Sequence, residues 1–131
     1  MFKRFLCVSF LVVFLVSAKV CAEPKFDSTL PLKGQSIASK LLQFDTLKAV
    51  YSVASVYNTR CQSYSVADTK LIHPIKDGTG KNGRYLTGYW KEAWVVNRCS
   101  QQVEIPILFT LDGKGGAYYQ INPKEITVKK Q

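Results

Sequence analysis

Histidine is almost absent from this 131-residue sequence, and that scarcity excludes several kinds of catalytic site. His73 is the only histidine, so a serine or cysteine nucleophile with a histidine base would have to use it. No serine lies in a Gly-x-Ser-x-Gly setting, and one histidine with scattered carboxylates cannot form a typical zinc shell. We therefore expect no catalytic residues, no metal and no cofactor. We interpret His73, beside Pro74, as a residue at the end of a strand.

Two glycine-rich segments resemble ligand-binding loops but lack the residues that binding requires. Residues 78–83 have neither the glycine spacing nor the Lys-Ser/Thr pair of a phosphate-binding loop. Residues 112–116 contain a single acidic side chain, which is too few for a calcium loop. We predict that both segments are turns between strands.

The sequence contains one long apolar run, Phe5 to Ala18, which is too short to span a bilayer comfortably. It follows a positively charged start, and Val20-Cys21-Ala22 has small residues where signal peptidase requires them. We therefore predict that residues 1–22 are a cleaved signal peptide of a periplasmic or secreted protein, with no stable membrane span after cleavage. The cysteine near the cut suggests a lipoprotein as the alternative, and the adjacent Lys19-Val20 argues against it.

Cysteine is scarce in the predicted mature protein, which keeps only Cys61 and Cys99. Two cysteines in an oxidising compartment most simply form one disulfide bridge, and they form no Cys-x-x-Cys motif of a reactive thiol pair. The closed loop of about 39 residues would contribute roughly 4 kcal/mol in the chain-entropy model.

The mature sequence contains one strong helix signal. Residues 23–33 hold two prolines and no period, and we interpret them as an extended lead-in to a single domain, residues 34–131. From Ser36 to just before Asn58 the apolar residues recur every three or four positions, which predicts an amphipathic helix of about five turns. The residues on this predicted apolar stripe are Ile37, Leu41, Phe44, Leu47, Val50, Tyr51 and Ala54.

Strand-forming residues dominate after the helix, and Pro106 suggests that its strand is an edge or carries a bulge. The last three predicted strands form an antiparallel meander, and the tail from Thr127 is expected to fray. The predicted fold is α+β, with one long N-terminal helix on a four- to five-stranded antiparallel sheet and one disulfide. The predicted strands are residues 61–66, 71–75, 85–98, 103–111 and 117–121.

The segments Trp90-Lys-Glu-Ala-Trp94, Cys99 and Asp112-Gly-Lys-Gly-Gly116 resemble a group of small exported bacterial proteins. Their pattern is Trp-x-Glu-x-Trp, a cysteine, an alternating strand and then Asp-Gly-x-Gly-Gly. The resemblance covers roughly residues 36–121 and implies an upstream helix and cysteine but no activity, because the group is functionally uncharacterised. The order of elements is also loosely similar to cystatin-like and nuclear-transport-factor-like folds. Many relatives have Cys-Gly where this sequence has Cys99-Ser100.

Trp90, Glu92 and Trp94 share one face of their predicted strand, because side chains alternate with period two. This face could be a stacking platform for a glycan or another small ligand. We favour the interpretation that it packs under the helix, with Glu92 partly buried and paired with Arg60 or Arg98.

Basic residues exceed acidic ones throughout the mature chain. Lys3, Arg4 and Lys19 leave with the predicted signal peptide, so the net charge falls from +9 to +6. The remaining charge favours an anionic surface or glycan as a partner. Export and the lack of a basic-aromatic motif lead us to expect no nucleic-acid partner. The densest basic cluster is Lys76, Lys81 and Arg84.

These observations predict an exported, non-enzymatic binding or protein–protein interaction module of the bacterial envelope, such as an inhibitor or accessory subunit. Its partner would be an envelope or extracellular protein. The alternative is a small-ligand or glycan-binding protein that uses Trp90, Glu92 and Trp94. A small hydrolase using Glu92 or His73 is less favoured.

Overall fold

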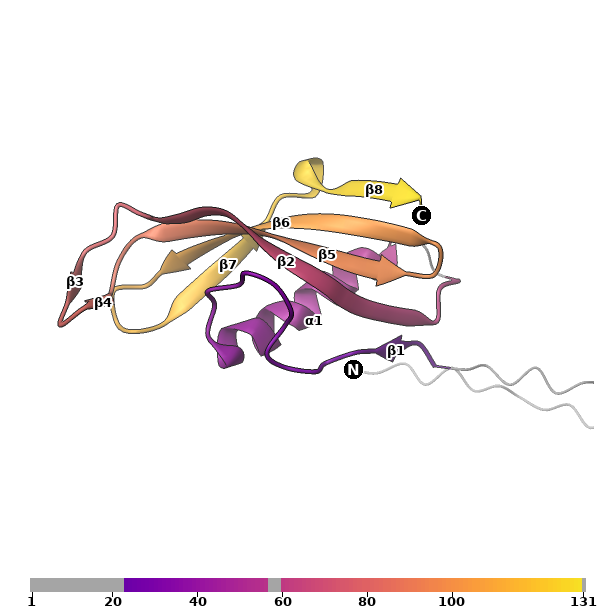
Figure 1. The fold of residues 1–131 in the computed structure, drawn as a ribbon, viewed down its shortest axis with the longest axis horizontal. Helices are drawn as coiled ribbons and strands as arrows, with labels where there is room; N and C mark the ends of the chain where they lie inside the picture. Colours follow the sequence, from indigo (N-terminus) through magenta and orange to yellow (C-terminus); the bar gives the residue numbers. More distant parts are fainter. Residues whose placement is uncertain (1–22, 57–59, 131) are drawn as a thin grey trace, which may run out of the picture.

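One helix packs against a curved, mostly antiparallel sheet in the computed structural model, which describes residues 23–56 and 60–130 (Figure 1). The predicted signal peptide lies outside these residues. Among them, no helix has the length and apolar character needed to cross a membrane. The elements are β1 (Lys25–Phe26), α1 (Lys40–Val56), β2 (Ser63–Lys76), β3 (Gly80–Lys81), β4 (Arg84–Tyr85), β5 (Tyr89–Arg98), β6 (Gln101–Leu111), β7 (Ala117–Ile121), the 3₁₀ helix η1 (Pro123–Glu125) and β8 (Thr127–Lys130).

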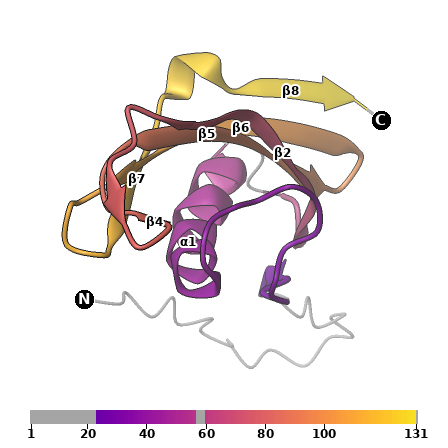
Figure 2. The same ribbon diagram turned by 60° about the vertical axis from the view of Figure 1, so that its left-hand side comes forward.

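The main sheet has six strands in the order β1-β2-β5-β6-β7, and β8 also pairs with β6. Figure 2 shows this sheet arching over α1. The predicted α+β class, the helix and the antiparallel meander are confirmed. The predicted strand number is wrong, because β1 pairs parallel to β2 and the tail expected to fray forms β8 against β6.

The predicted N-terminal position of the helix is wrong, because α1 follows β1 and lies in the middle of the chain. The helix also begins at Lys40 rather than Ser36. The backbone N–H groups just before it are bound to the sheet: Ser36 N donates to Thr69 Oγ1 and Ile37 N donates to Glu92 Oε1. Ser39 then caps the helix, since its hydroxyl accepts a hydrogen bond from Leu42 N at 3.2 Å. Contacts with the sheet therefore set the first residue of α1.

The strand β2, between β1 and β5, has 14 residues and takes the place of the two predicted strands, residues 61–66 and 71–75. Its register against β5 shifts three times, and the last two shifts flank His73 and Pro74. Such irregularities let a strand accommodate a proline, which has no N–H for the ladder. His73 therefore lies within β2 rather than at the end of a strand.

Pro106 lies in a central strand, and not at the sheet edge. Residues 101–104 of β6 pair with β8, and residues 107–111 pair with β7. Pro106 lies in the gap between these pairings, so its missing N–H removes no bond to either β7 or β8.

The core lies between the inner face of the sheet and one side of α1. Trp94, Ile105 and Phe109 from the sheet are fully buried against Val50 and Ala54 of the helix. The predicted Cys61–Cys99 bridge is present and joins the start of the sheet region to the β5–β6 turn.

Candidate functional site

The side chain of Glu92 is fully buried beneath α1, between Trp90 and Trp94. Its Oε1 accepts hydrogen bonds from Trp90 Nε1 and from the backbone N–H of Ile37, both at 2.9 Å. Its Oε2 accepts a hydrogen bond from Trp94 Nε1 at 2.7 Å. We call this arrangement the Glu92 clamp, comprising Glu92, both indoles and the Ile37 amide. It joins β5 to the residue just before the helix.

Of the two arginines predicted to pair with Glu92, Arg60 and Arg98, the second donates to other acceptors. Arg98 Nη1 donates to Ala54 O at 2.6 Å, and its Nη2 donates to Gln101 Oε1 at 2.8 Å. Three N–H donors, from Trp90, Trp94 and Ile37, satisfy the buried Glu92 carboxylate.

Neither indole is available as a stacking platform. Trp90 is 4% exposed and Trp94 is 0% exposed, and both pack against the Phe109 ring. A ligand that stacks on an indole needs an open ring face, so the clamp itself cannot grip a sugar in this conformation.

A cavity of about 500 Å³ opens beside the clamp, at the end of the sheet nearest the start of α1. We call it the open-end cavity. Trp90 and Ile37, two members of the clamp, contribute to its lining, so the Glu92 carboxylate positions part of the wall without lining it. The other lining residues are Ser39, Leu41, Leu42, Asp45, Ile75, Gly83, Arg84, Tyr85, Leu111, Gly115, Gly116 and Ala117.

The β3–β4 hairpin forms one wall of the open-end cavity. Gly78, just before the hairpin, permits close packing against it, since a Cβ on Gly78 would lie 2.7 Å from the Tyr85 ring. The hairpin is tied to the β6–β7 turn because Gly113 N donates to Leu86 O at 2.9 Å. Both glycine-rich segments predicted as turns thus support the same wall.

The β6–β7 turn is organised by the carboxylate of Asp112. Its Oδ1 accepts hydrogen bonds from Lys114 N at 2.7 Å and Gly116 N at 3.0 Å. These backbone donors favour the charged form and hold the pKa of Asp112 below its usual value. The turn therefore has a structural organiser rather than a candidate calcium ligand set.

Several side chains around the cavity are apolar and exposed. Leu41 is 72% exposed, Tyr85 53% and Ile37 46%. The helical spacing had placed Ile37, Leu41 and Phe44 on the buried stripe. Leu47, Val50, Tyr51 and Ala54 of that stripe are buried, together with Gln43 and Thr46. Leu41 lies on the opposite side of the helix, and Phe44 lies at the border of the buried face, on the side that it shares with Tyr51.

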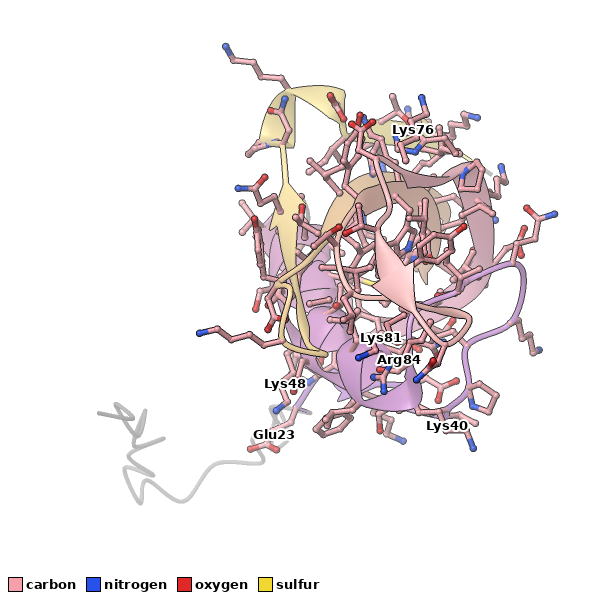
Figure 3. All side chains as sticks on the ribbon, turned by 90° about the vertical axis from the view of Figure 1, so that its left-hand side faces the viewer. Glu23, Lys40, Lys48, Lys76, Lys81 and Arg84 are labelled. Atoms are coloured by element: carbon pink, nitrogen blue, oxygen red, sulfur yellow. A yellow bond between two sulfur atoms is a disulfide. The ribbon has the colours of Figure 1, made fainter. Side chains whose placement is uncertain are left out.

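Basic side chains lie near the same end of the molecule. Figure 3 shows Lys81 and Arg84, from β3 and β4, close together, with Lys40 from the first turn of α1 below them. Lys76 lies well away from this pair, so the predicted cluster of three is not a single patch. Asp45 is the acidic residue among the side chains that line the cavity.

A smaller cavity of about 300 Å³ lies between β1 and α1. Lys48 Nζ lies 4.5 Å from the centre of the Phe44 ring at its rim. Tyr51 also lines it and donates its hydroxyl to Asp27 O. Burial raises the pKa of Tyr51 to about 12.

Family models, curated proteins and solved structures yield no match to this chain. The resemblance to small exported bacterial proteins therefore stays a prediction.

The described residues bring together no set of three or more histidine, cysteine, aspartate or glutamate side chains that could hold a metal ion. His73 packs edge-on against Tyr89, with 5.8 Å between ring centres, and its Nδ1 lies 3.1 Å from Pro74 O. The open-end cavity can therefore offer apolar contacts from its lining and positive charge from its rim.

Proposed function

We propose that this protein is an exported, non-enzymatic protein–protein interaction module of the bacterial envelope, and that the open-end cavity is its recognition site. The observation that carries the proposal is the group of exposed apolar side chains around a preformed hollow. Leu41 is 72% exposed and Tyr85 is 53% exposed, although both line the cavity. Apolar side chains grouped around a hollow are typical of surfaces that a partner covers.

A protein partner fits this geometry better than a small ligand does. Small-molecule sites usually enclose most of the ligand surface. Here the lining residues Ile37, Leu41 and Tyr85 are themselves 46% to 72% exposed, so a small ligand would leave much of them uncovered. A glycan held by the Glu92 clamp has less support, because both indole faces are buried against the core.

Export to the periplasm or beyond is part of the proposal. The Cys61–Cys99 bridge supports it, because structural disulfides persist in oxidising compartments. An inhibitor or accessory subunit is the kind of module that such a surface would serve.

The test compares two substitutions on the same helix, Leu41→Ser and Val56→Ser. Both side chains are exposed, at 72% and 75%, but Leu41 lines the cavity and Val56 does not. Wild-type and variant proteins would capture partners from envelope extracts, with quantification by mass spectrometry. We expect a partner that binds wild type and Val56→Ser equally and Leu41→Ser about tenfold less, as one apolar contact of about 1.4 kcal/mol predicts. Equal capture by all three proteins would refute the proposed site.

A further inference from the structure

We infer that the open-end cavity binds an acidic segment of a partner protein and that this segment inserts one apolar side chain. This inference rests on the proposed function and adds the chemistry of the partner. Two independent features of the cavity carry it: the apolar character of its lining and the sign of the charge on its rim.

The first feature is an apolar floor at the bottom of an open hollow. Trp90, Leu42 and Leu111 line the cavity and are at least partly buried, whereas Leu41 and Tyr85 extend from its edge. The volume of about 500 Å³ is large enough for one bulky aliphatic or aromatic side chain. A buried anchor side chain surrounded by partly exposed contacts is the usual arrangement of a binding hot spot.

The second feature is the excess of cations around the entrance. Arg84 lines the cavity, and Figure 3 shows Lys81 beside it and Lys40 on the first turn of the helix. Asp45 is the opposing carboxylate in the lining. The Asp112 carboxylate also lies in the adjoining β6–β7 turn, where its own backbone bonds engage it. Three cations against these two carboxylates leave a net positive charge, which favours carboxylates on the partner that would steer its approach and fix its orientation.

Arg84 is well placed to bind such a carboxylate. Its Nη2 donates to Gly115 O at 3.5 Å, which is at the outer limit for a hydrogen bond. A partner carboxylate would form a shorter, charge-assisted bond with the guanidinium at little cost to the hairpin.

An anionic membrane surface is a different class of partner with the same sign of charge. The hollow shape and the Asp45 carboxylate favour a peptide, because a bilayer presents no single side chain to fill the cavity and would repel Asp45. The experiment below separates the two.

The experiment measures binding of short fluorescein-labelled peptides to the exported protein by fluorescence anisotropy at low and moderate salt. The probe has a central phenylalanine between aspartate and glutamate residues. Comparison peptides carry serine in place of phenylalanine, or lysines in place of the acidic residues. Vesicles of phosphatidylglycerol form a separate arm.

Charge-reversed proteins provide the matched controls. The double variant Lys81→Glu/Arg84→Glu changes the rim, and Lys129→Glu/Lys130→Glu makes the same charge change on exposed residues of β8. We expect the rim variant to bind the acidic probe about tenfold more weakly and the β8 variant to bind within about twofold of wild type. The rim variant should also gain affinity for the lysine peptide. Circular dichroism would check that both variants are folded.

Three results would overturn the inference. They are equal binding of acidic and lysine peptides, no loss when serine replaces the phenylalanine, and binding to vesicles with none to the probe. Each leaves the proposed function standing if a captured partner still depends on Leu41, so the two proposals fail separately.

Discussion

Replacing Glu92 by glutamine tests whether the Glu92 clamp holds the fold together. The substitution keeps the size of the side chain and exchanges one acceptor oxygen for an NH₂ donor. In the best orientation the amide oxygen still accepts from Trp90 and Ile37, at the position of Oε1. The NH₂ group then faces Trp94 Nε1, which lies 2.7 Å from Oε2 in the native protein. Two buried donors, the new amide NH₂ and Trp94 Nε1–H, would then face each other with no acceptor between them.

The expected loss follows from the buried groups left without a partner. Each unsatisfied buried donor costs about 1–3 kcal/mol, and the surviving bonds lose the strength that a charged acceptor gives them. Removing a buried charge offsets part of this loss, since its desolvation is no longer required. We therefore expect Glu92→Gln to lower the free energy of unfolding by about 2–4 kcal/mol, a large share of the 5–15 kcal/mol typical of a domain.

Urea unfolding followed by circular dichroism measures this loss, with Glu104→Gln as the control. This control makes the same chemical change on β6. The Glu104 side chain is 30% exposed, and its Oε2 lies 3.7 Å from Lys70 Nζ. A surface ion pair of this kind is worth about 0–1 kcal/mol.

A double-mutant cycle identifies the contact responsible. Trp94→Phe removes the donor that opposes the new amide, so Glu92→Gln should cost about 1–2 kcal/mol less in that background. Equal losses for Glu92→Gln and Glu104→Gln, or an additive cycle, would refute the clamp.

Two further predictions concern stability. Replacing Cys61 and Cys99 together by alanine should lower the free energy of unfolding by about 4 kcal/mol in the chain-entropy model, given their separation of 38 residues; two free thiols on alkylation of the denatured native protein would contradict the bridge. Burial raises the pKa of Tyr51 to about 12 in the folded protein, against about 10 in the unfolded chain. The neutral Tyr51 hydroxyl therefore contributes fully to the stability of the fold below about pH 10, and this contribution is lost as the pH rises toward 12. The unfolding free energy of wild type should therefore fall relative to Tyr51→Phe across that interval, and parallel curves would show that the Tyr51 hydroxyl contributes nothing.

The spacing of apolar residues along the chain predicts the longer helix and strands of the fold. The three- and four-residue repeat indicates α1, and alternation indicates β5, β6 and β7. The strands β1 and β8, with two and four residues, are too short to produce a pattern and form because β2 and β6 offer them unpaired edges. The starting residue of α1 likewise depends on bonds from Ser36 and Ile37 to distant strands.

The candidate site illustrates the same division. The spacing Trp-x-Glu-x-Trp places two indole N–H groups on the same strand face as a carboxylate. It therefore indicates two of the three donors of the clamp. The third donor, Ile37 N, is 55 residues away from Glu92 in sequence and has no local signal. The open-end cavity was missed for a related reason. The apolar residues Ile37 and Leu41 fit a buried helical stripe. Ile37 instead lies in the segment before α1, and the orientation of α1 on the sheet exposes Leu41.

The Glu92 clamp connects stability to recognition. A leucine at this position would avoid the desolvation of a carboxylate and would pack acceptably in the core. It could not, however, hold three N–H groups from separate places in the fold. Two of those groups belong to Trp90 and Ile37, which line the open-end cavity. The carboxylate thus holds Trp90 and Ile37 in place in the cavity wall. Glu92 is therefore a positioning residue for a site that it does not line.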